Sequence, residues 1–489
     1  MIYMQKVITL LCVNIVLGCL STGLYANAQL TSDFYESMLQ KDNNNEALLH
    51  LFFTKMPKGG DIHHHYDGSI YAETYLEWVD KKGWKIDKCT LRIIKEEKNK
   101  TCDLLSVSQL MKDNTLYRKL LTLWSDKDYY NYTHNQPPPD SNFFNTFAFF
   151  GAVSQEYNNL GLNILKQRAI KENVSYIETM LSRPKIYSSN YFDNNILEKY
   201  NQRLRAASSQ KETDSILDEI VTTYKKTKTF TISLDSYIAT VKKDHANLDD
   251  ENFMIRYQTF AVRVLEPVQV FTELFSGYLA ANRSPLIVGV NIVAPENNHV
   301  TLKDYTLQMR MYHYLNQRYP NVNRALHAGE LTLGMVRPKD LTFHIREARE
   351  IADAQRIGHG VDISYEDHSI ELLKDIKKNS VVEINFSSNE FILGVKGDKH
   401  PYLIYEKYNV PLVISTDDSG VSRNNLTDEY VILATRYHPT YKRIKEYVYN
   451  SIKYSFLEKE EKQYLIKDLD KRFLSFESEM VSFYKELLH

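Results

Sequence analysis

The sequence predicts an α/β protein with the (β/α)₈ barrel architecture (a TIM barrel), in which eight parallel strands alternate with helices. Short apolar runs rich in β-branched residues recur along the chain, and stretches with helical spacing separate them. Eight such runs are the number that closes a barrel. The expected strands are residues 61–65, 174–180, 229–234, 286–293, 324–327, 355–357, 381–386 and 410–415.

The length and the charge of the chain limit its class of function. A (β/α)₈ barrel with insertions can reach 489 residues, so one large domain accounts for the chain. The 60 basic and 62 acidic residues nearly cancel, to a net charge of -2. This balance gives no reason to expect nucleic acid or an anionic membrane as partner. We therefore expect a small-molecule ligand.

Residues 1–28 are typical of a signal peptide. Lys6 supplies the positive end, residues 7–20 form a short apolar run, and Ala26-Asn27-Ala28 offers a small-x-small cleavage site. The chain is therefore expected to be secreted or periplasmic, with a mature form that starts near Gln29. No later stretch reaches the ~20 apolar residues of a transmembrane helix, so no transmembrane span is expected.

The cysteines bear on the same question of export. Cys19 follows Val-Leu-Gly, which leaves lipid attachment open as an alternative to cleavage. Cleavage would remove Cys12 and Cys19, so that only Cys89 and Cys102 remain in the mature chain. Two cysteines this close in an exported protein predict a disulfide that closes a surface loop.

The sequence divides around the barrel. Residues 29–55 are expected to be a short N-terminal helical arm, and residues 56–489 the barrel domain. Residues 84–142 follow no clean period and contain both cysteines, so we interpret them as an insertion after the first strand. Residues 441–457 and 458–488 are strongly helical and should pack over the outside or the bottom of the barrel.

Polar residues follow several of the expected strands at their carboxyl ends. They are His63, His65 and Asp67 after the first strand, His327-Ala328-Gly329-Glu330 at the fifth, Gly358-His359-Gly360 at the sixth, and Asp417-Asp418 at the eighth. His63 and His65 are two apart, so both side chains leave the same face of a strand, while His64 points the other way. Active sites of such barrels lie at this end.

Each of these groups also has a purely structural explanation. His327 could be a hydrogen-bonded core histidine, His359 a turn residue between glycines, and Asp417-Asp418 a helix N-cap pair. Their coincidence at four strand ends favours a site. Three neutral imidazoles and one carboxylate suit Zn²⁺, and an open coordination position would hold a water of lowered pKa.

The segments MPKGGDIHHHYDG, HAGE, RIGHG and STDD, in this order, resemble the adenosine deaminase family. The resemblance runs from Met56 to Leu457. The leader and the cysteine-containing insertion are similar to the secreted adenosine-deaminase-related growth factor branch. The family implies a (β/α)₈ barrel that hydrolyses adenosine or 2′-deoxyadenosine to inosine or 2′-deoxyinosine and releases ammonia.

The resemblance also implies roles for individual residues. His63, His65, His327 and Asp417 match the family's ligands of one zinc ion per chain. Glu330 matches the acid that protonates purine N1. This role agrees with the chemistry, because attack on C6 places charge on N1 and a facing carboxylic acid stabilises it.

The remaining family positions concern the water and the nucleoside. His359 and Asp418 match the pair that orients and deprotonates the attacking water. Asp67 matches the carboxylate that contacts the ribose 5′-hydroxyl, and His65 and Ala294 are further expected nucleoside contacts. An ionised Asp67 would repel a phosphate, so free nucleoside is expected as the substrate rather than AMP.

The sequence departs from the family pattern near the substrate. Asn291 stands where the family usually has an aspartate, and Ala294 replaces a glycine whose backbone N–H meets purine N3. Ser419 and Phe386 stand at two positions where proline is usual. These changes bear on substrate affinity and specificity, not on the metal ligands.

Two other functions remain open at this point. A related amidohydrolase could act on another aminopurine or on a nucleotide with the same metal ligands. An extracellular signalling or binding protein could use the barrel as a scaffold, although the intact ligand set and Glu330 speak against an inactive enzyme. A homodimer is a further expectation.

Overall fold

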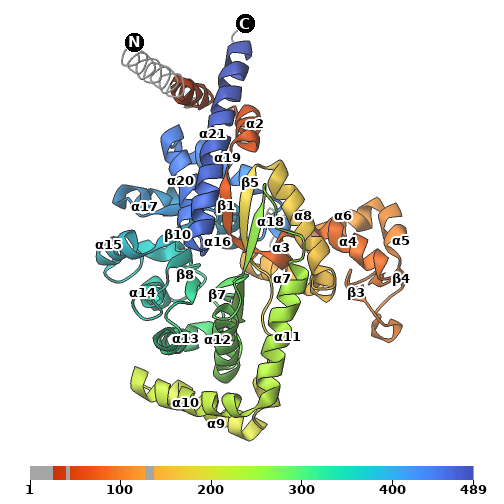
Figure 1. Ribbon diagram of the computed structural model, residues 1–489. Coiled ribbons are helices and arrows are strands. Elements are labelled where there is room, and N and C mark those ends of the chain that lie inside the picture. The colour runs from red at the N-terminus through yellow and green to blue at the C-terminus, as the bar shows by residue number, and fades with distance from the viewer. Residues whose placement is uncertain (1–25, 40–44, 127–136, 488–489) are drawn as a thin grey trace, which may run out of the picture.

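The computed structural model describes residues 26–39, 45–126 and 137–487 (Figure 1). The predicted leader therefore lies outside the described residues, except for Ala26, Asn27 and Ala28. In the part of the chain that is described, none of the helices combines the length and the apolar character needed to cross a membrane.

Eight parallel strands form one sheet that curves into a nearly closed barrel, which confirms the predicted fold class. Backbone hydrogen bonds join its first and last strands, from Asp417 N–H to His63 O at 2.9 Å and from His65 N–H to Asp417 O at 3.1 Å. In spatial order the strands are β1 (Gly59–His65), β5 (Val174–Met180), β6 (Met254–Val262), β7 (Ile287–Val293), β8 (Asn323–Ala328), β9 (Arg356–His359), β10 (Val381–Ile384) and β11 (Leu412–Ile414).

Helices surround the barrel and fill the connections between its strands. Their apolar faces and the strands share one core. These helices are α3 (Tyr66–Ser69), α4 (Ala72–Lys81), α7 (Pro139–Ser154), α8 (Asn158–Lys171), α9 (Asn194–Ala206), α10 (Gln210–Lys226), α11 (Lys228–Asp244), α12 (Pro267–Ala281), α13 (His299–Arg318), α14 (His344–Glu350), α15 (Ser369–Asn379), α16 (Phe386–Leu393), α17 (Tyr402–Tyr408), α18 (Ser419–Ser422) and α19 (Leu426–Tyr437).

One expected strand is wrong. Residues 229–234 lie inside helix α11, where Phe230, Leu234 and Val241 are buried at helical spacing. The third barrel strand is β6 instead, which carries the buried polar side chains of Arg256 and Gln258. Because of these polar residues, β6 is not an apolar run and is not recognised as a strand. The β-branched residues of α11, in contrast, are typical of strands.

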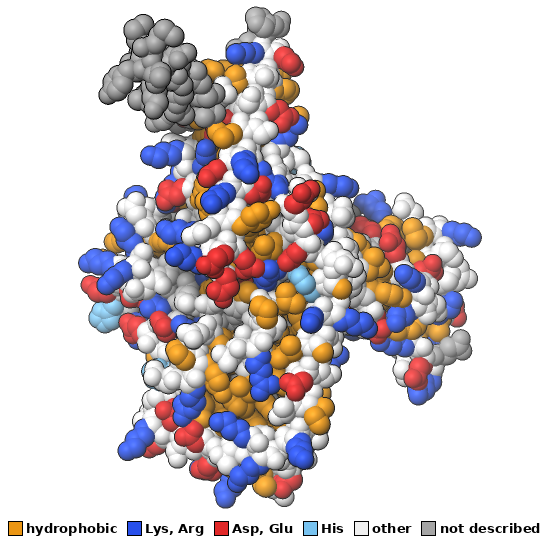
Figure 2. Space-filling model, viewed as in Figure 1, with side chains coloured by type: hydrophobic (Ala, Val, Ile, Leu, Met, Phe, Trp, Pro, Cys, Tyr) orange, Lys and Arg blue, Asp and Glu red, His pale blue; other side chains and the backbone are white. Residues whose placement is uncertain are grey.

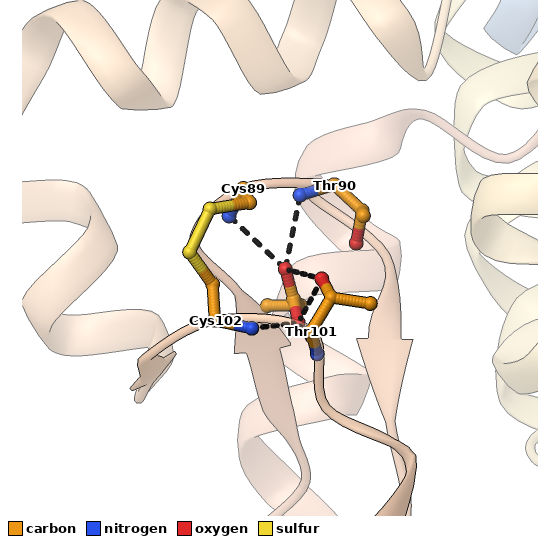
Figure 3. The surroundings of a disulfide bond; sticks show 5 residues. Cys89, Thr90, Thr101 and Cys102 are labelled. Carbon is orange, nitrogen blue, oxygen red and sulfur yellow. Dashed lines mark hydrogen bonds between the residues drawn. A yellow bond between two sulfur atoms is a disulfide. The ribbon is translucent and has the colours of Figure 1, made fainter.

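The segment after α4 forms a small lobe that projects from the barrel to the right in Figure 1. It contains a three-stranded antiparallel sheet of β2 (Lys85–Asp87), β3 (Ile93–Ile94) and β4 (Leu104–Leu105), and the helices α5 (Val107–Lys112) and α6 (Asn114–Leu123). The predicted disulfide is present between Cys89 and Cys102, whose Cα atoms are 5.7 Å apart (Figure 3).

A carboxylate reinforces the disulfide loop. Asp87 accepts backbone hydrogen bonds from Cys89 and Thr90 at 3.0 Å each, from Thr101 at 2.6 Å and from Cys102 at 3.1 Å (Figure 3). Both ends of the loop are therefore held by the side chain of Asp87 as well as by the covalent bond.

The N-terminal arm consists of a helix over residues 26–37 and of α2 (Glu46–Lys55). The arm packs on the C-terminal helices, because the ring of Phe52 lies 5.1 Å from that of Phe476 and the ring of Phe34 lies 4.8 Å from that of Tyr484. The two ends of the described chain accordingly lie together at the top of Figure 1.

The C-terminal helices α20 (Tyr441–Lys453) and α21 (Lys459–Leu487) follow the last strand. Ser451 of α20 accepts a hydrogen bond from the backbone N–H of Gly60, at the start of β1, at 2.7 Å. The backbone N–H of Phe456 reaches Glu178 inside the barrel at 2.9 Å. The predicted packing at the bottom of the barrel is confirmed.

The surface agrees with the balanced composition. On the face drawn in Figure 2, Lys and Arg side chains alternate with Asp and Glu, and hydrophobic side chains gather in the lower part of the view. This face offers no extended basic surface for nucleic acid.

Candidate metal centre and substrate cavity

A cavity of about 330 Å³ opens at the carboxyl ends of the barrel strands. Its floor is polar and its wall is apolar, as in most small-molecule sites. The floor contains His65, Asp67, His327, Glu330, His359, Asp417 and Asp418. The wall contains Phe143, Phe144, Phe147, Met180, Phe260, Val293, Ala294 and Pro295.

His63, His65 and Asp417 meet where the first and last strands pair. His65 Nε2 lies 3.1 Å from Asp417 Oδ1, and His63 Nε2 lies 3.4 Å from the same oxygen. Both histidines leave one face of β1, as their spacing predicts. His64 points away and its Nδ1 is 2.9 Å from the hydroxyl of Thr179.

His327 completes the predicted set. Its Nε2 lies 3.1 Å from His65 Nε2, and its ring centroid lies 4.6 Å from that of His63. Burial, first of all, and the neighbouring imidazoles hold the pKa of His327 well below its usual value. A neutral imidazole is the form that binds metal.

His359 stands beside these residues on the same floor. Its Nε2 lies 3.7 Å from Glu330 Oε1 and 3.7 Å from Asp417 Oδ2, and its Nδ1 lies 2.8 Å from Asn389 Oδ1. One possible ligand atom each of His63, His327, His359 and Asp417 lies within 4.8 Å of the others. His359 therefore approaches as closely as the predicted ligands.

The chemistry of these donors fits a metal ion. Buried His63 Nε2, His359 Nε2 and Asp417 Oδ1 lack hydrogen-bond partners, although unpartnered buried polar atoms are rare in folded proteins. His359 and Asp417 also adopt positive φ angles of 70° and 62°, a backbone conformation that non-glycine residues seldom adopt. Imidazole nitrogens with one carboxylate are a ligand set of Zn²⁺.

The position of His63 depends on a glycine in strand β9, which is not paired with β1. A Cβ atom at Gly358 would lie 2.6 Å from Cε1 of His63, too close for any side chain. The Gly-His-Gly segment therefore supplies His359 and leaves room for the ring of His63.

Glu330 lies two residues beyond β8 and lines the cavity. Its backbone N–H and that of Gly329 donate to the carboxylate of Glu296, at 2.8 Å and 3.1 Å. Burial raises the pKa of the Glu330 carboxyl. A raised pKa favours the protonated form, which a proton donor needs.

Asp418 follows Asp417 and is also buried. Burial and the adjacent Asp417 carboxylate raise the pKa of Asp418 well above its usual value. A Cβ atom at Gly68 would lie 1.6 Å from Asp418 Oδ1, so only glycine at this position leaves the space that the Asp418 carboxylate occupies.

Asp67 lies on α3, at the rim of the cavity, as predicted. Gln155 donates a hydrogen bond of 2.6 Å to its Oδ1, and burial raises the pKa of Asp67 to about 6. A hollow of about 160 Å³ continues beyond Asp67 and is lined by Arg183 and Lys185, among others. Arg183 is ion-paired with the buried Glu273.

The departures from the family pattern have structural counterparts. Ala294 lines the cavity with a φ angle of 87°, a conformation that favours glycine. Ser419 Oγ accepts a hydrogen bond of 3.2 Å from Arg168. Phe386 begins α16 and its ring packs 5.0 Å from that of His400. Asn291 lies next to His327, with 2.9 Å between Asn291 Oδ1 and His327 Nδ1.

Sequence reasoning missed two groups of residues at the site. Phe143, Phe144 and Phe147 of α7 form much of the wall, although the chain carries them close to the predicted insertion. Glu383 contacts His63 Nδ1 at 2.6 Å from strand β10. A charged residue inside an apolar strand, as in Val-Val-Glu-Ile, is a sequence signal that could have identified Glu383.

Comparison with known proteins agrees with this arrangement. The family model described as Adenosine deaminase matches residues 167–472. An adenosine deaminase of Clostridium perfringens (strain SM101) is 24% identical over 408 residues, which are 83% of this chain and 96% of that protein. One from Clostridium acetobutylicum is 33% identical over 147 residues, 30% of this chain and 41% of that protein.

Solved structures share the fold. An N6-mAMP deaminase of Arabidopsis superposes with a TM-score of 0.55 at 17% identity, covering 86% of this chain and 99% of that one. An amidohydrolase of Burkholderia ambifaria with bound Zn gives a TM-score of 0.52 at 13% identity, covering 88% and 94%. At these identities the likeness concerns the barrel alone.

Proposed function

The chain belongs to the adenosine deaminase family, and we propose that it is a zinc-dependent hydrolase that deaminates adenosine and 2′-deoxyadenosine. The products would be inosine or 2′-deoxyinosine and ammonia. The observation that carries this proposal is the convergence of His65, His327 and Asp417 at the floor of the cavity, beside Glu330, with the buried His63 against Asp417.

The proposed zinc ligands are His63, His65, His327 and Asp417, with one ion per chain. When bound, the ion lowers the pKa of water and so supplies a nucleophile at neutral pH. The buried, unpartnered His63 Nε2 and Asp417 Oδ1 are the donor atoms that support this assignment.

The residues around the proposed ligands divide the proton transfers. Glu330, whose pKa burial raises, donates a proton to purine N1 as charge develops there. His359 and Asp418 hold the attacking water and take up its proton, since both side chains line the floor. Asn389 fixes the ring of His359 through a hydrogen bond of 2.8 Å to Nδ1.

The nucleoside is held by the rim and the wall. Asp67 accepts a hydrogen bond from the ribose 5′-hydroxyl, and the backbone N–H of Ala294 faces purine N3. The phenylalanines of α7 cover the apolar face of the base.

An ultraviolet assay tests this function directly. We expect purified protein to convert adenosine to inosine, to lose this activity with a strong chelator, and to regain it with added zinc. Protein that carries about one zinc per chain but leaves adenosine and 2′-deoxyadenosine unchanged would contradict the substrate. Protein without zinc after reconstitution would contradict the metal site.

A second candidate substrate is a purine nucleotide. The hollow beyond Asp67 brings Arg183 and Lys185 to the end of the cavity where a 5′-phosphate would lie. The sequence next to His65 contains no such cation, so this observation comes from the fold. Arg183 is already paired with Glu273, which leaves Lys185 as the cation of this hollow that forms no ion pair with another described residue. Free nucleoside therefore remains the better candidate.

We expect AMP to be disfavoured by roughly 10³-fold or more in kcat/KM relative to adenosine. A phosphate would lose the hydrogen bond to Asp67 and meet a like charge there. Parallel kinetics on adenosine, 2′-deoxyadenosine and AMP measure the ratio, and Lys185→Ala serves as the matched variant. Comparable efficiency on AMP that falls in Lys185→Ala would instead favour a nucleotide deaminase.

We further propose that the protein is exported and belongs to the adenosine-deaminase-related growth factor branch. The leader-like residues 1–28 and the Cys89–Cys102 disulfide support export, since disulfides persist in oxidising compartments. Mass spectrometry of the mature protein should find a start near Gln29, whereas a lipid on Cys19 would indicate membrane anchoring. Light scattering tests the proposed homodimer.

A further inference from the structure

A chain of buried polar side chains crosses the barrel interior below the proposed metal site. Its centre is Arg356 of β9, which is 1% exposed. Arg356 Nη1 lies 2.8 Å from Glu178 Oε1, and its Nε lies 2.6 Å from Glu383 Oε1. A guanidinium can only donate, so Glu178 Oε1 and Glu383 Oε1 each face a donor and act as acceptors.

From Arg356, two arms lead to two of the proposed zinc ligands. The short arm is Glu383 alone, whose Oε2 contacts His63 Nδ1 at 2.6 Å. The long arm runs from Glu178 through Gln258 and Asn291 to His327. Gln258 Nε2 donates to Glu178 Oε1 at 2.9 Å. Asn291 Nδ2 donates to Gln258 Oε1 at 2.9 Å.

The arms and the two histidines come from seven neighbouring strands of the barrel. His63 lies on β1, Glu178 on β5, Gln258 on β6, Asn291 on β7, His327 on β8, Arg356 on β9 and Glu383 on β10. Glu178, Gln258 and Asn291 are each at most 1% exposed. Water therefore does not compete for their hydrogen bonds, and each donor must find its acceptor within the chain.

Each hydrogen bond of the long arm has a fixed donor and a fixed acceptor. Glu178 accepts, so Gln258 must turn its NH₂ group toward Glu178 and its oxygen toward Asn291. Asn291 must then donate to Gln258 and turn its oxygen toward His327. The backbone N–H of Ile292 also donates to Asn291 Oδ1 at 2.8 Å, which agrees with this orientation.

The last hydrogen bond of this series is made by the imidazole of His327. Because Asn291 Oδ1 can only accept, His327 Nδ1, 2.9 Å away, must carry the proton. His327 Nε2 then presents a lone pair toward His65 and Asp417.

We propose that Gln258 is a positioning residue for the metal site. It donates to Glu178, which Arg356 holds as an acceptor, and it accepts from Asn291. Asn291 is thereby oriented to accept from His327 Nδ1, which fixes the tautomer of His327 that binds zinc. We call this series of hydrogen bonds the relay. This inference rests on the proposed function for the identity of the metal.

The choice of Gln258 matters because it contacts neither the cavity nor a proposed ligand. Outer residues that orient a ligating histidine typically change metal affinity by ~10–100-fold when replaced. A residue with only a structural role would lower stability and leave metal affinity unchanged. The two roles are therefore separable in one set of variants.

The experiment measures zinc dissociation constants by chelator competition, and thermal unfolding of the same metal-free proteins. Gln258→Leu removes the relay and should weaken zinc binding by ~10–100-fold. Asn201→Leu is the control, because it loses one buried hydrogen bond of 2.9 Å, to Val268 N–H, away from the relay. It should lower the unfolding temperature and retain zinc.

A rescue variant tests the direction of the relay. In Gln258→Leu combined with Asn291→Asp, the carboxylate at 291 can only accept from His327 and needs no donor to orient it. This double variant should bind zinc more tightly than Gln258→Leu alone. If Gln258→Leu does not fold, Gln258→Glu takes its place. The glutamate side chain has the shape of glutamine and keeps an oxygen that accepts from Asn291. A proton shared between this carboxyl and Glu178 restores the hydrogen bond between residues 258 and 178, so zinc affinity should stay near that of the wild type.

The outcomes separate this inference from the proposed function. Equal zinc affinity in the wild type and in Gln258→Leu would overturn the inference and leave the function intact. Loss of affinity without recovery in the double variant, or loss in Gln258→Glu, would also overturn it. A wild-type protein that binds no zinc would overturn the proposed metal site and the inference together.

Discussion

The floor and the wall of the cavity are built from different parts of the chain. The floor comes from residues at the ends of barrel strands, such as His327 near the end of β8 and Asp417 after β11. Much of the wall comes from α7, a helix that follows the projecting lobe. The floor residues stand in recognisable motifs, whereas the phenylalanines of α7 do not.

Because of this difference, we expect the floor and the wall to determine different kinetic properties. The floor carries the ionisable groups, so it should govern the chemical step and the metal. The wall offers apolar contact, so it should govern affinity and the choice of nucleoside. Substitutions in the two regions should therefore separate kcat from KM.

The largest effect is expected when the floor loses a metal ligand. His327→Ala should remove bound zinc and lower kcat/KM by more than ~10³-fold, because the metal supplies several kcal/mol of transition-state stabilisation. Metal analysis and the adenosine assay measure both. His359→Ala is the matched variant and should keep zinc while losing activity. If His359→Ala loses zinc and His65→Ala retains it, then His359 rather than His65 is a zinc ligand.

The next effect concerns proton donation from the floor. Glu330→Gln should lower kcat by at least ~10²-fold and leave zinc and folding intact, as is typical when a general acid is lost. Because burial raises the pKa of Glu330, the wild-type rate should fall as the pH rises through that raised pKa and the proton is lost. The variant should lack this limb of the pH profile. Near-normal kcat in Glu330→Gln would refute the role.

The wall should respond in KM. Phe147→Ala should raise KM for adenosine about ten-fold with little change in kcat, since ~1.4 kcal/mol of lost contact energy is one factor of ten. Phe149→Ala on the same helix is the control, because Phe149 packs under Arg92 and does not line the cavity. A fall in kcat without a change in KM would show that the wall takes part in the chemical step.

The smallest effect on catalysis is expected in the lobe. Replacing Cys89 and Cys102 by Ser removes a bond that is worth ~3 kcal/mol in the chain-entropy model. Thermal unfolding should occur at a lower temperature, while kcat/KM changes less than two-fold or so. Asp87 still holds both ends of the loop after this change. A large loss of activity would connect the lobe to the cavity through α7.

Much of the fold could be predicted because barrel strands are short, apolar and regularly spaced. The exception is β6, which carries Arg256 and Gln258. Arg256 is bound by Asp249, seven residues away, and by the distant Glu461, and Gln258 is bound by the distant Glu178 and Asn291. A reading of local hydrophobicity cannot anticipate such partners. Tertiary contacts then decide which of two adjacent segments becomes the strand.

The floor could be predicted from motifs, and the wall could not. His63, His65, His327, Glu330 and Asp417 follow strands in short, distinctive segments, so their convergence follows from parallel topology. The wall depends on how α7 packs, and Arg92 of the preceding lobe contacts this helix by a hydrogen bond of 3.0 Å to the carbonyl of Ala148. Residues such as Gln155, which contacts Asp67 from the end of this helix, become visible only in three dimensions.

The pairing of the first and last barrel strands has a consequence for how the protein is made. His63 and Asp417 share one backbone hydrogen bond, although 354 residues separate them in the chain. During synthesis the N-terminal strands leave the ribosome first and have no partner for the open edge of β1 until β11 emerges. The proposed metal ligands can therefore assemble only when translation is nearly complete, and until then the edge of β1 is a place where a chaperone can bind.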